Sequence, residues 1–113
     1  MFDHERLDVY RMAAEFDGVV CKLLPRRGHA ALRDQMERAS ASVMANIAEG
    51  AGRWMSGEKR HFYAMARGSA TECVALLDAL TNRGCLSDDT REECRERLLN
   101  IVRILSKLCS PTP

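Results

Sequence analysis

The chain contains no proline between residues 26 and 110, and this feature constrains its fold more than any other. Proline lacks a backbone N–H donor and breaks helix interiors, so a long stretch without it is compatible with long helices. Only 5% of the residues are aromatic, and no segment alternates in the manner of β-strands. The sequence therefore predicts an all-α protein.

Apolar residues recur at alternating steps of three and four in four segments, which is the spacing of one helix face. We expect the first helix to begin after an Asp3 N-cap and to end near Leu24, because Pro25 follows. The second is expected to end at about Gly50 or Gly52. The apolar stripes of these two segments are Val9, Ala13, Phe16, Val20 and Leu23, then Leu32, Met36, Ala39, Val43 and Ile47.

The third helix is expected to follow a Ser56 N-cap and to stop at Gly84, a residue type that favours helix ends. Ser87 or Asp88 is expected to cap the fourth. Their stripes are Phe62, Ala66, Ser69, Cys73, Leu76 and Leu80, then Cys94, Leu98, Ile101, Leu105 and Leu108.

Each predicted helix has about 20 residues, hence a length of roughly 30 Å. Short connections force consecutive helices to lie antiparallel. The sequence thus predicts one up-down-up-down four-helix bundle over residues 1–113, with a frayed tail at 110–113.

The net charge of +1 indicates no global attraction to nucleic acid or to an anionic membrane. No apolar run reaches the length of a membrane span, and the first residues do not resemble a signal peptide, so we expect a cytoplasmic protein. Five widely spaced cysteines fit small buried apolar residues in a reducing compartment better than disulfides or metal ligands.

Polar and small residues replace apolar ones where the stripe of the second helix continues. Asn46, Gly50 and Arg53 fall on it, with Glu49 beside them. A buried polar group is costly unless it is hydrogen-bonded, so we expect a structural network that sets helix pairing. Its predicted members are Asn46, Glu49, Gly50, Ser69 and Glu72, with Arg53 as a further candidate and with Gly50 and Gly68 allowing close helix approach. The alternative is a ligand or catalytic site with Glu49 and Glu72 as paired carboxylates.

The same residues resemble a known family. Ala45–Gly50 with Gly52 and Arg53, followed by Ala66–Ser69 and Glu72, resembles the four-helix-bundle proteins encoded in intervening sequences of bacterial large-subunit ribosomal RNA genes. The likeness extends over nearly the whole chain, through Tyr10, Ala13, Leu32–Gln35, Ala39–Ser42, Leu80 and Gly84.

The resemblance implies an antiparallel bundle that assembles into a ring-like homo-oligomer, often a pentamer. One related branch resembles the accessory variability proteins of diversity-generating retroelements, which bind a reverse transcriptase and its RNA. Apolar residues off the main stripes also suggest an interface between copies, namely Tyr10, Met12, Met44, Met65 and Val102.

Basic residues gather in the middle of the sequence. Residues 22–67 carry nine basic and four acidic side chains, whereas the rest of the chain carries eight and twelve. The candidates for binding RNA or a protein partner are Arg26, Arg27, Arg33, Arg38, Arg53, Lys59, Arg60 and Arg67, with Arg26, Arg33 and Arg38 as a stripe on the second helix. Arginine suits phosphate, but it suits carboxylates of a second subunit equally well. Trp54 and Tyr63 are candidates for base stacking, for capping the bundle or for an interface.

The sequence offers no catalytic constellation, no metal motif and no cofactor motif. Glu-x-x-His pairs are absent, and Gly50-Ala51-Gly52 is not followed by the residues of a phosphate-binding loop. Ser40 and Ser42 lack a nearby base and are interpreted as packing residues. We therefore expect a non-enzymatic protein without a small-molecule substrate or membrane contact. The family resemblance implies an accessory protein that binds a reverse transcriptase and structured RNA. The alternative is a self-assembling bundle with no nucleic-acid role.

Overall fold

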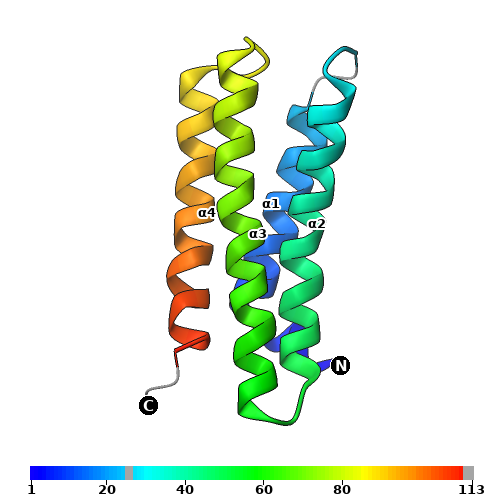
Figure 1. Ribbon diagram of the computed structural model, residues 1–113, viewed down its shortest axis with the longest axis vertical. Helices are drawn as coiled ribbons and strands as arrows, with labels where there is room; N and C mark the ends of the chain where they lie inside the picture. The colour runs from blue at the N-terminus through cyan, green and yellow to red at the C-terminus, as the bar shows by residue number, and fades with distance from the viewer. Residues whose placement is uncertain (25–26, 111–113) are drawn as a thin grey trace.

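A computed structural model describes residues 1–24 and 27–110. In this part of the chain a 3₁₀ helix, η1 (Asp3–Arg6), precedes four α-helices: α1 (Asp8–Leu23), α2 (Ala30–Gly52), α3 (Ser56–Asn82) and α4 (Asp88–Leu108). Figure 1 shows the α2–α3 connection at one end of the molecule and the other two connections at the opposite end, so consecutive helices run in opposite directions. The predicted all-α, four-helix fold is confirmed.

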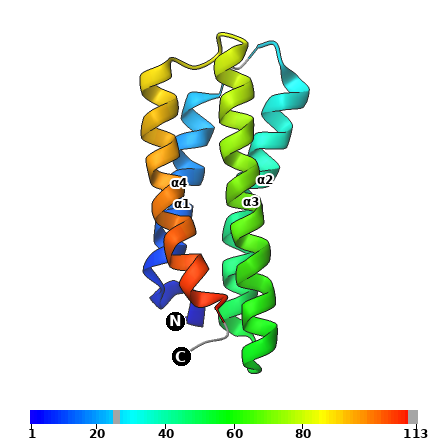
Figure 2. The same cartoon turned by 60° about the vertical axis from the view of Figure 1, so that its left-hand side comes forward.

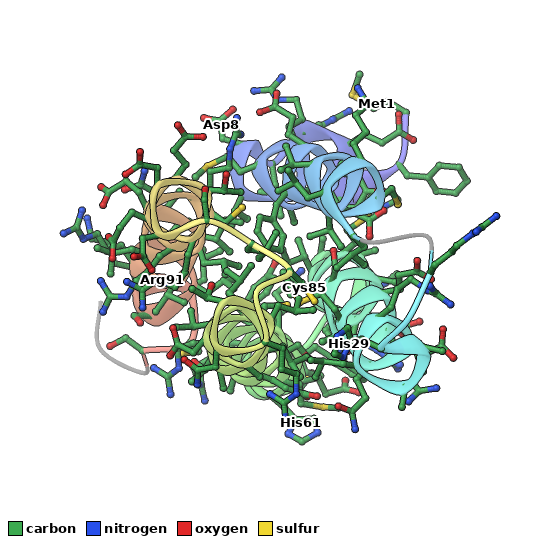
Figure 3. All side chains as sticks on the ribbon, turned by 90° about the horizontal axis from the view of Figure 1, so that it is seen from above. Met1, Asp8, His29, His61, Cys85 and Arg91 are labelled. Carbon is green, nitrogen blue, oxygen red and sulfur yellow. The ribbon has the colours of Figure 1, made fainter. Side chains whose placement is uncertain are left out.

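The helices occupy the corners of a square in chain order, as the view from above shows (Figure 3). Each packs against the two helices beside it, and η1 packs against α1 and α2. The bundle measures 43 × 25 × 20 Å, and the N-terminus and the end of α4 lie at the same end as the α2–α3 turn (Figure 2).

The ends of the helices follow the predicted residues closely, with two corrections. Asp3 does not cap the first helix, because it begins η1 and α1 starts only after Leu7. Ser56 is the first residue of α3, and its N-cap is Met55. Pro25 and the tail residues 111–113 lie outside the described residues.

Two predicted boundaries are formed by specific hydrogen bonds. The Ser87 side chain accepts a bond of 3.1 Å from the Thr90 backbone N–H and caps α4. Gly84 ends the third helical segment with a φ of 77°, a left-handed conformation that glycine adopts without steric cost. Its N–H donates to Thr81, and the next N–H donates to Leu80, so both carbonyls at the end of α3 are satisfied.

The predicted apolar stripes form most of the core. Leu23, Leu32, Ser69 and Leu108 are only partly buried, and on α3 the core contains Tyr63 in place of the predicted Phe62. Fully enclosed side chains come from the three longer helices, and α1 contributes Phe16 at 1% exposure. The side chains with no exposed surface include Met36, Ile47, Leu80, Leu98, Ile101 and Leu105. Burial of residues this size contributes about 1.5–3 kcal/mol each, so the bundle is held chiefly by this core.

Candidate functional site

The outer seam between α2 and α3 carries a chain of three polar side chains. The Asn46 Nδ2 group donates to the Ser42 carbonyl at 2.9 Å and lies 3.0 Å from the Ser42 Oγ atom. Ser42 Oγ in turn lies 2.9 Å from Ser69 Oγ on α3. The Ser42–Ser69 bond joins α2 to α3, and the two Asn46 bonds lie within α2.

The predicted membership of this network was partly wrong. Glu49 and Glu72 are exposed, and no hydrogen bond joins either of them to Ser42, Asn46 or Ser69. Glu49 forms an ion pair with Arg53 at 2.9 Å instead. Ser42, interpreted from the sequence as a packing residue, is the hub. Its position one helical turn before Asn46 was the signal that could have identified it.

The two glycines that were expected to allow close helix approach differ. A Cβ atom on Gly50 would lie 2.8 Å from Cε1 of Tyr63, so the tyrosine ring packs directly on the glycine. Gly68 is exposed, and a Cβ atom there would meet no atom within 4 Å. Close approach is therefore confirmed at Gly50 only. Because Tyr63 is buried, it is not a base-stacking residue.

A second serine forms a buried polar contact that the sequence interpretation missed. Ser40 has no exposed surface, and its Oγ atom donates to Asp17 on α1 at 2.8 Å. This bond ties α2 to α1, just as Ser42 ties α2 to α3. In the described part of the chain, neither serine is hydrogen-bonded to a histidine.

The turn between α2 and α3 is braced by two cations. Arg53 pairs with Glu49, lies 3.8 Å from a Glu58 oxygen, and stacks 4.7 Å from the centre of the Phe62 ring. Lys59 Nζ donates to the carbonyls of Gly50 and Ala51 at 3.2 and 2.9 Å. The Lys59 side chain, from the first turn of α3, thus adds hydrogen bonds to two carbonyls at the end of α2. Both basic candidates are engaged within the chain.

The eight basic candidates do not form one surface. Arg27 lies at the α1–α2 connection, whereas Arg53, Lys59 and Arg60 lie at the opposite end of the bundle (Figure 1). Arg26 lies outside the described residues. The other two members of the predicted stripe on α2 are Arg33 and Arg38. They are five residues apart, so their side chains diverge by about 140° around the helix and the predicted stripe is wrong. Asp34 and Glu37 lie between them in the sequence, and Arg67 is exposed on α3.

The predicted interface residues also divide. Tyr10, Met12, Met44 and Val102 pack against the core and are partly buried. Only Met65 of this set is strongly exposed, at 45%. Of these five side chains, Met65 is thus exposed, and the other four are partly covered within the chain.

Among the cysteines, Cys73 and Cys94 are buried, as expected, whereas Cys21 is exposed on α1. Burial raises the pKa of the Cys73 thiol to about 12, with smaller contributions from Glu72 and Asp17. Burial likewise raises the pKa of Cys94. Both thiols remain protonated at neutral pH and are poor nucleophiles. In residues 1–24 and 27–110, no cluster of metal-ligating side chains is present.

Two grooves flank α3. A polar one of 300 Å³ lies over the α2–α3 seam, between Arg38, Ser42, Ser69 and Glu72. An apolar one of 180 Å³ lies between α3 and α4, with Thr71, Val74, Leu98, Leu99 and Val102 as its walls and Arg95 at its rim. Across the described residues no helix has the length and apolar character to cross a membrane.

Comparison with known proteins agrees with this architecture. Residues 5–107 match the model of the family described as 23S rRNA-intervening sequence protein. The chain belongs to this family. A crystal structure from Bacteroides thetaiotaomicron, described as a protein with unknown function from the S23 ribosomal protein family, shares the fold with a TM-score of 0.82. It is 18% identical, and the match covers 96% of this chain and 98% of that one. No curated protein matches the chain.

Proposed function

We propose that this intervening-sequence family protein is a non-enzymatic accessory protein that acts as a homo-oligomer, with a pentamer as the assembly that the family resemblance favours. Its outer α2–α3 face is one side of the contact between copies. The partners of the assembly are a reverse transcriptase and its RNA, as in the retroelement branch that the sequence resembles.

The composition of the exposed helix faces carries this proposal. Nine of the eleven exposed residues of α4 are charged, whereas only four of the twelve on α3 are. On the second half of α2 the exposed residues are Ala41, Ala45, Glu49 and Gly52. On α3, Met65, Gly68 and Ala75 lie on one stripe that also includes the exposed Glu72. Small uncharged residues let helices approach closely and cost little to desolvate, so this face suits a protein contact.

The arrangement of side chains supports a binding role over catalysis. Glu49 is paired with Arg53, and Glu72 is exposed at the groove rim, so the two carboxylates do not form an acid–base pair in a sheltered site. The serines bond to Asp17, Asn46 and each other. The buried thiols are held protonated.

Direct RNA contact is proposed as a property of the assembly. Within one protomer the basic residues lie at both ends of the bundle and acids separate them. Repetition around a ring would bring equivalent arginines of several copies onto one face, and phosphate binding grows with the number of contacts. The alternative function, self-assembly without a nucleic-acid role, is favoured by the same interspersed acids.

The test combines mass measurement with capture. Ala45→Arg together with Met65→Arg places two cations on the α2–α3 face. Gly18→Arg serves as the control, because Gly18 is an exposed residue of α1 and no atom lies within 4 Å of its Cβ position. We expect the double variant to lose the oligomer in light scattering and the control to keep it.

The partner is tested with a reverse transcriptase of a diversity-generating retroelement and the RNA transcript of that element. Retention of both by the wild-type protein, and their loss from the double variant, is the expected result. An intact oligomer that retains neither would contradict the adaptor role and leave self-assembly alone.

A further inference from the structure

Trp54 is the most exposed large apolar side chain of the described residues. It is 95% exposed in the α2–α3 turn, and the adjacent Met55 is 66% exposed. Tryptophan is the residue most enriched among energetic anchors of protein interfaces, since its large ring gains much when it leaves water. The wild-type chain contains only this one tryptophan.

The turn that presents Trp54 is held in place on both sides. Arg53 is fixed by Glu49 and by the Phe62 ring, and Lys59 bonds the last carbonyls of α2. A side chain on a braced turn loses less conformational freedom on binding than one on a mobile loop. The tip is thus organised for insertion before a partner arrives.

The apolar groove between α3 and α4 fits such a side chain. Its walls are Val74, Leu98, Leu99 and Val102, and Leu99 is 36% exposed at its edge. Its volume of 180 Å³ is close to that of an apolar cavity of about 150 Å³ that accommodates benzene. Arg95 at the rim offers a guanidinium to the face of an aromatic ring, and tryptophan is the best partner for this cation–π contact.

The tip and the groove cannot meet within one chain. Trp54 precedes the start of α3, whereas Thr71 and Val74 lie 15 to 18 residues into that helix, roughly 22–27 Å along its axis. Figure 2 shows α3 and α4 side by side above the turn. Each copy therefore presents one unfilled groove and one exposed tip at separate places.

We infer that Trp54 of one copy inserts into the α3–α4 groove of the next, which makes the contact between copies head-to-tail. This inference rests on the proposed self-assembly and specifies its interface. Such a heterologous contact uses two different surfaces, so it closes into a ring when the rotation between copies allows. The offset of tip and groove along the bundle means that adjacent bundles are staggered or crossed rather than aligned.

The experiment uses two complementary variants. Trp54→Ala removes the tip and keeps the groove, whereas Leu99→Arg blocks the groove and keeps the tip. Both positions are exposed, so circular dichroism is expected to match wild type. We expect each variant alone to have the mass of one chain in light scattering. An equimolar mixture should form a heterodimer with one intact contact and nothing larger.

Fluorescence of Trp54 gives an independent readout. On dilution of the wild-type oligomer into monomer, the emission should move to longer wavelength, and in the mixture it should move to shorter wavelength than in Leu99→Arg alone. An oligomer whose emission remains that of a solvent-exposed indole, or whose mass survives either variant, overturns this inference but not self-assembly. A wild-type monomer at micromolar concentration overturns both.

Discussion

Replacement of Gly50 by alanine is expected to destabilise the bundle, although alanine is the better helix former. The new Cβ atom would lie 2.8 and 2.9 Å from two carbons of the Tyr63 ring, well inside the 3.5–4.0 Å of a favourable carbon contact. Overpacking of this kind costs roughly 1–3 kcal/mol, and the gain in helix propensity is at most about 1 kcal/mol. The free energy of unfolding should therefore fall by about 0.5–2 kcal/mol, measured by urea denaturation at one fixed protein concentration.

A double-mutant cycle separates the clash from other effects. Tyr63→Leu removes the ring, so Gly50→Ala in that background should be neutral or mildly stabilising, with a coupling energy on the order of 1–2 kcal/mol. Gly18→Ala is the matched control, because no atom lies within 4 Å of its Cβ position inside α1. It should gain about 0.5–1 kcal/mol. The reasoning is refuted if Gly50→Ala is as stable as this control.

Three further predictions concern polar and charged groups. Asn46→Leu should lower the free energy of unfolding by about 0.5–1.5 kcal/mol, because Ser42 loses its donor at a half-buried site; an unchanged urea midpoint would contradict this. Thiol labelling of the native protein should modify Cys21 first and Cys73 only on unfolding. The free energy of unfolding should fall as pH rises above 9, because the Cys73 thiol then loses its proton in the unfolded chain but keeps it up to about pH 12 in the folded protein. Equal labelling rates would refute the first part, and constant stability between pH 9 and pH 11 the second. If the assembly binds RNA, the logarithm of its binding constant should fall by roughly 0.7–0.9 per phosphate contact for each tenfold rise in salt concentration. Replacement of Arg26, Arg27 and Arg33 by glutamine should flatten that slope in filter binding, and the helix content should stay intact. An unchanged slope would exclude these arginines.

Most of the fold could be predicted from the sequence because it depends on local rules. The three-four stripes, Ser87 and Gly84 each specify a helix face or a helix end without reference to the rest of the chain. The error at Asp3 arose because a short 3₁₀ helix, with Phe2 as its N-cap, occupies Asp3–Arg6 and precedes α1. The error at Ser56 displaced the cap by one residue.

The candidate site was less predictable because it depends on contacts between helices. The periodicity placed Asn46 and Gly50 near a seam, but the partner across that seam depends on the offset between α2 and α3. That offset brings Ser42 to Ser69 and Tyr63 to Gly50. By contrast, the failure of the Arg33–Arg38 stripe could have been predicted from the sequence, because a five-residue spacing in a helix separates two side chains by about 140°.

The central claim, that the protein acts as a homo-oligomer, is tested most directly by the mass of the wild-type protein in solution. Multi-angle light scattering on a micromolar sample should give five times the chain mass of 12.7 kDa. Another multiple would keep self-assembly and contradict the pentamer. A mass of 12.7 kDa across the micromolar range would contradict the account as a whole, since the α2–α3 face and the Trp54 tip would then have no second copy to contact.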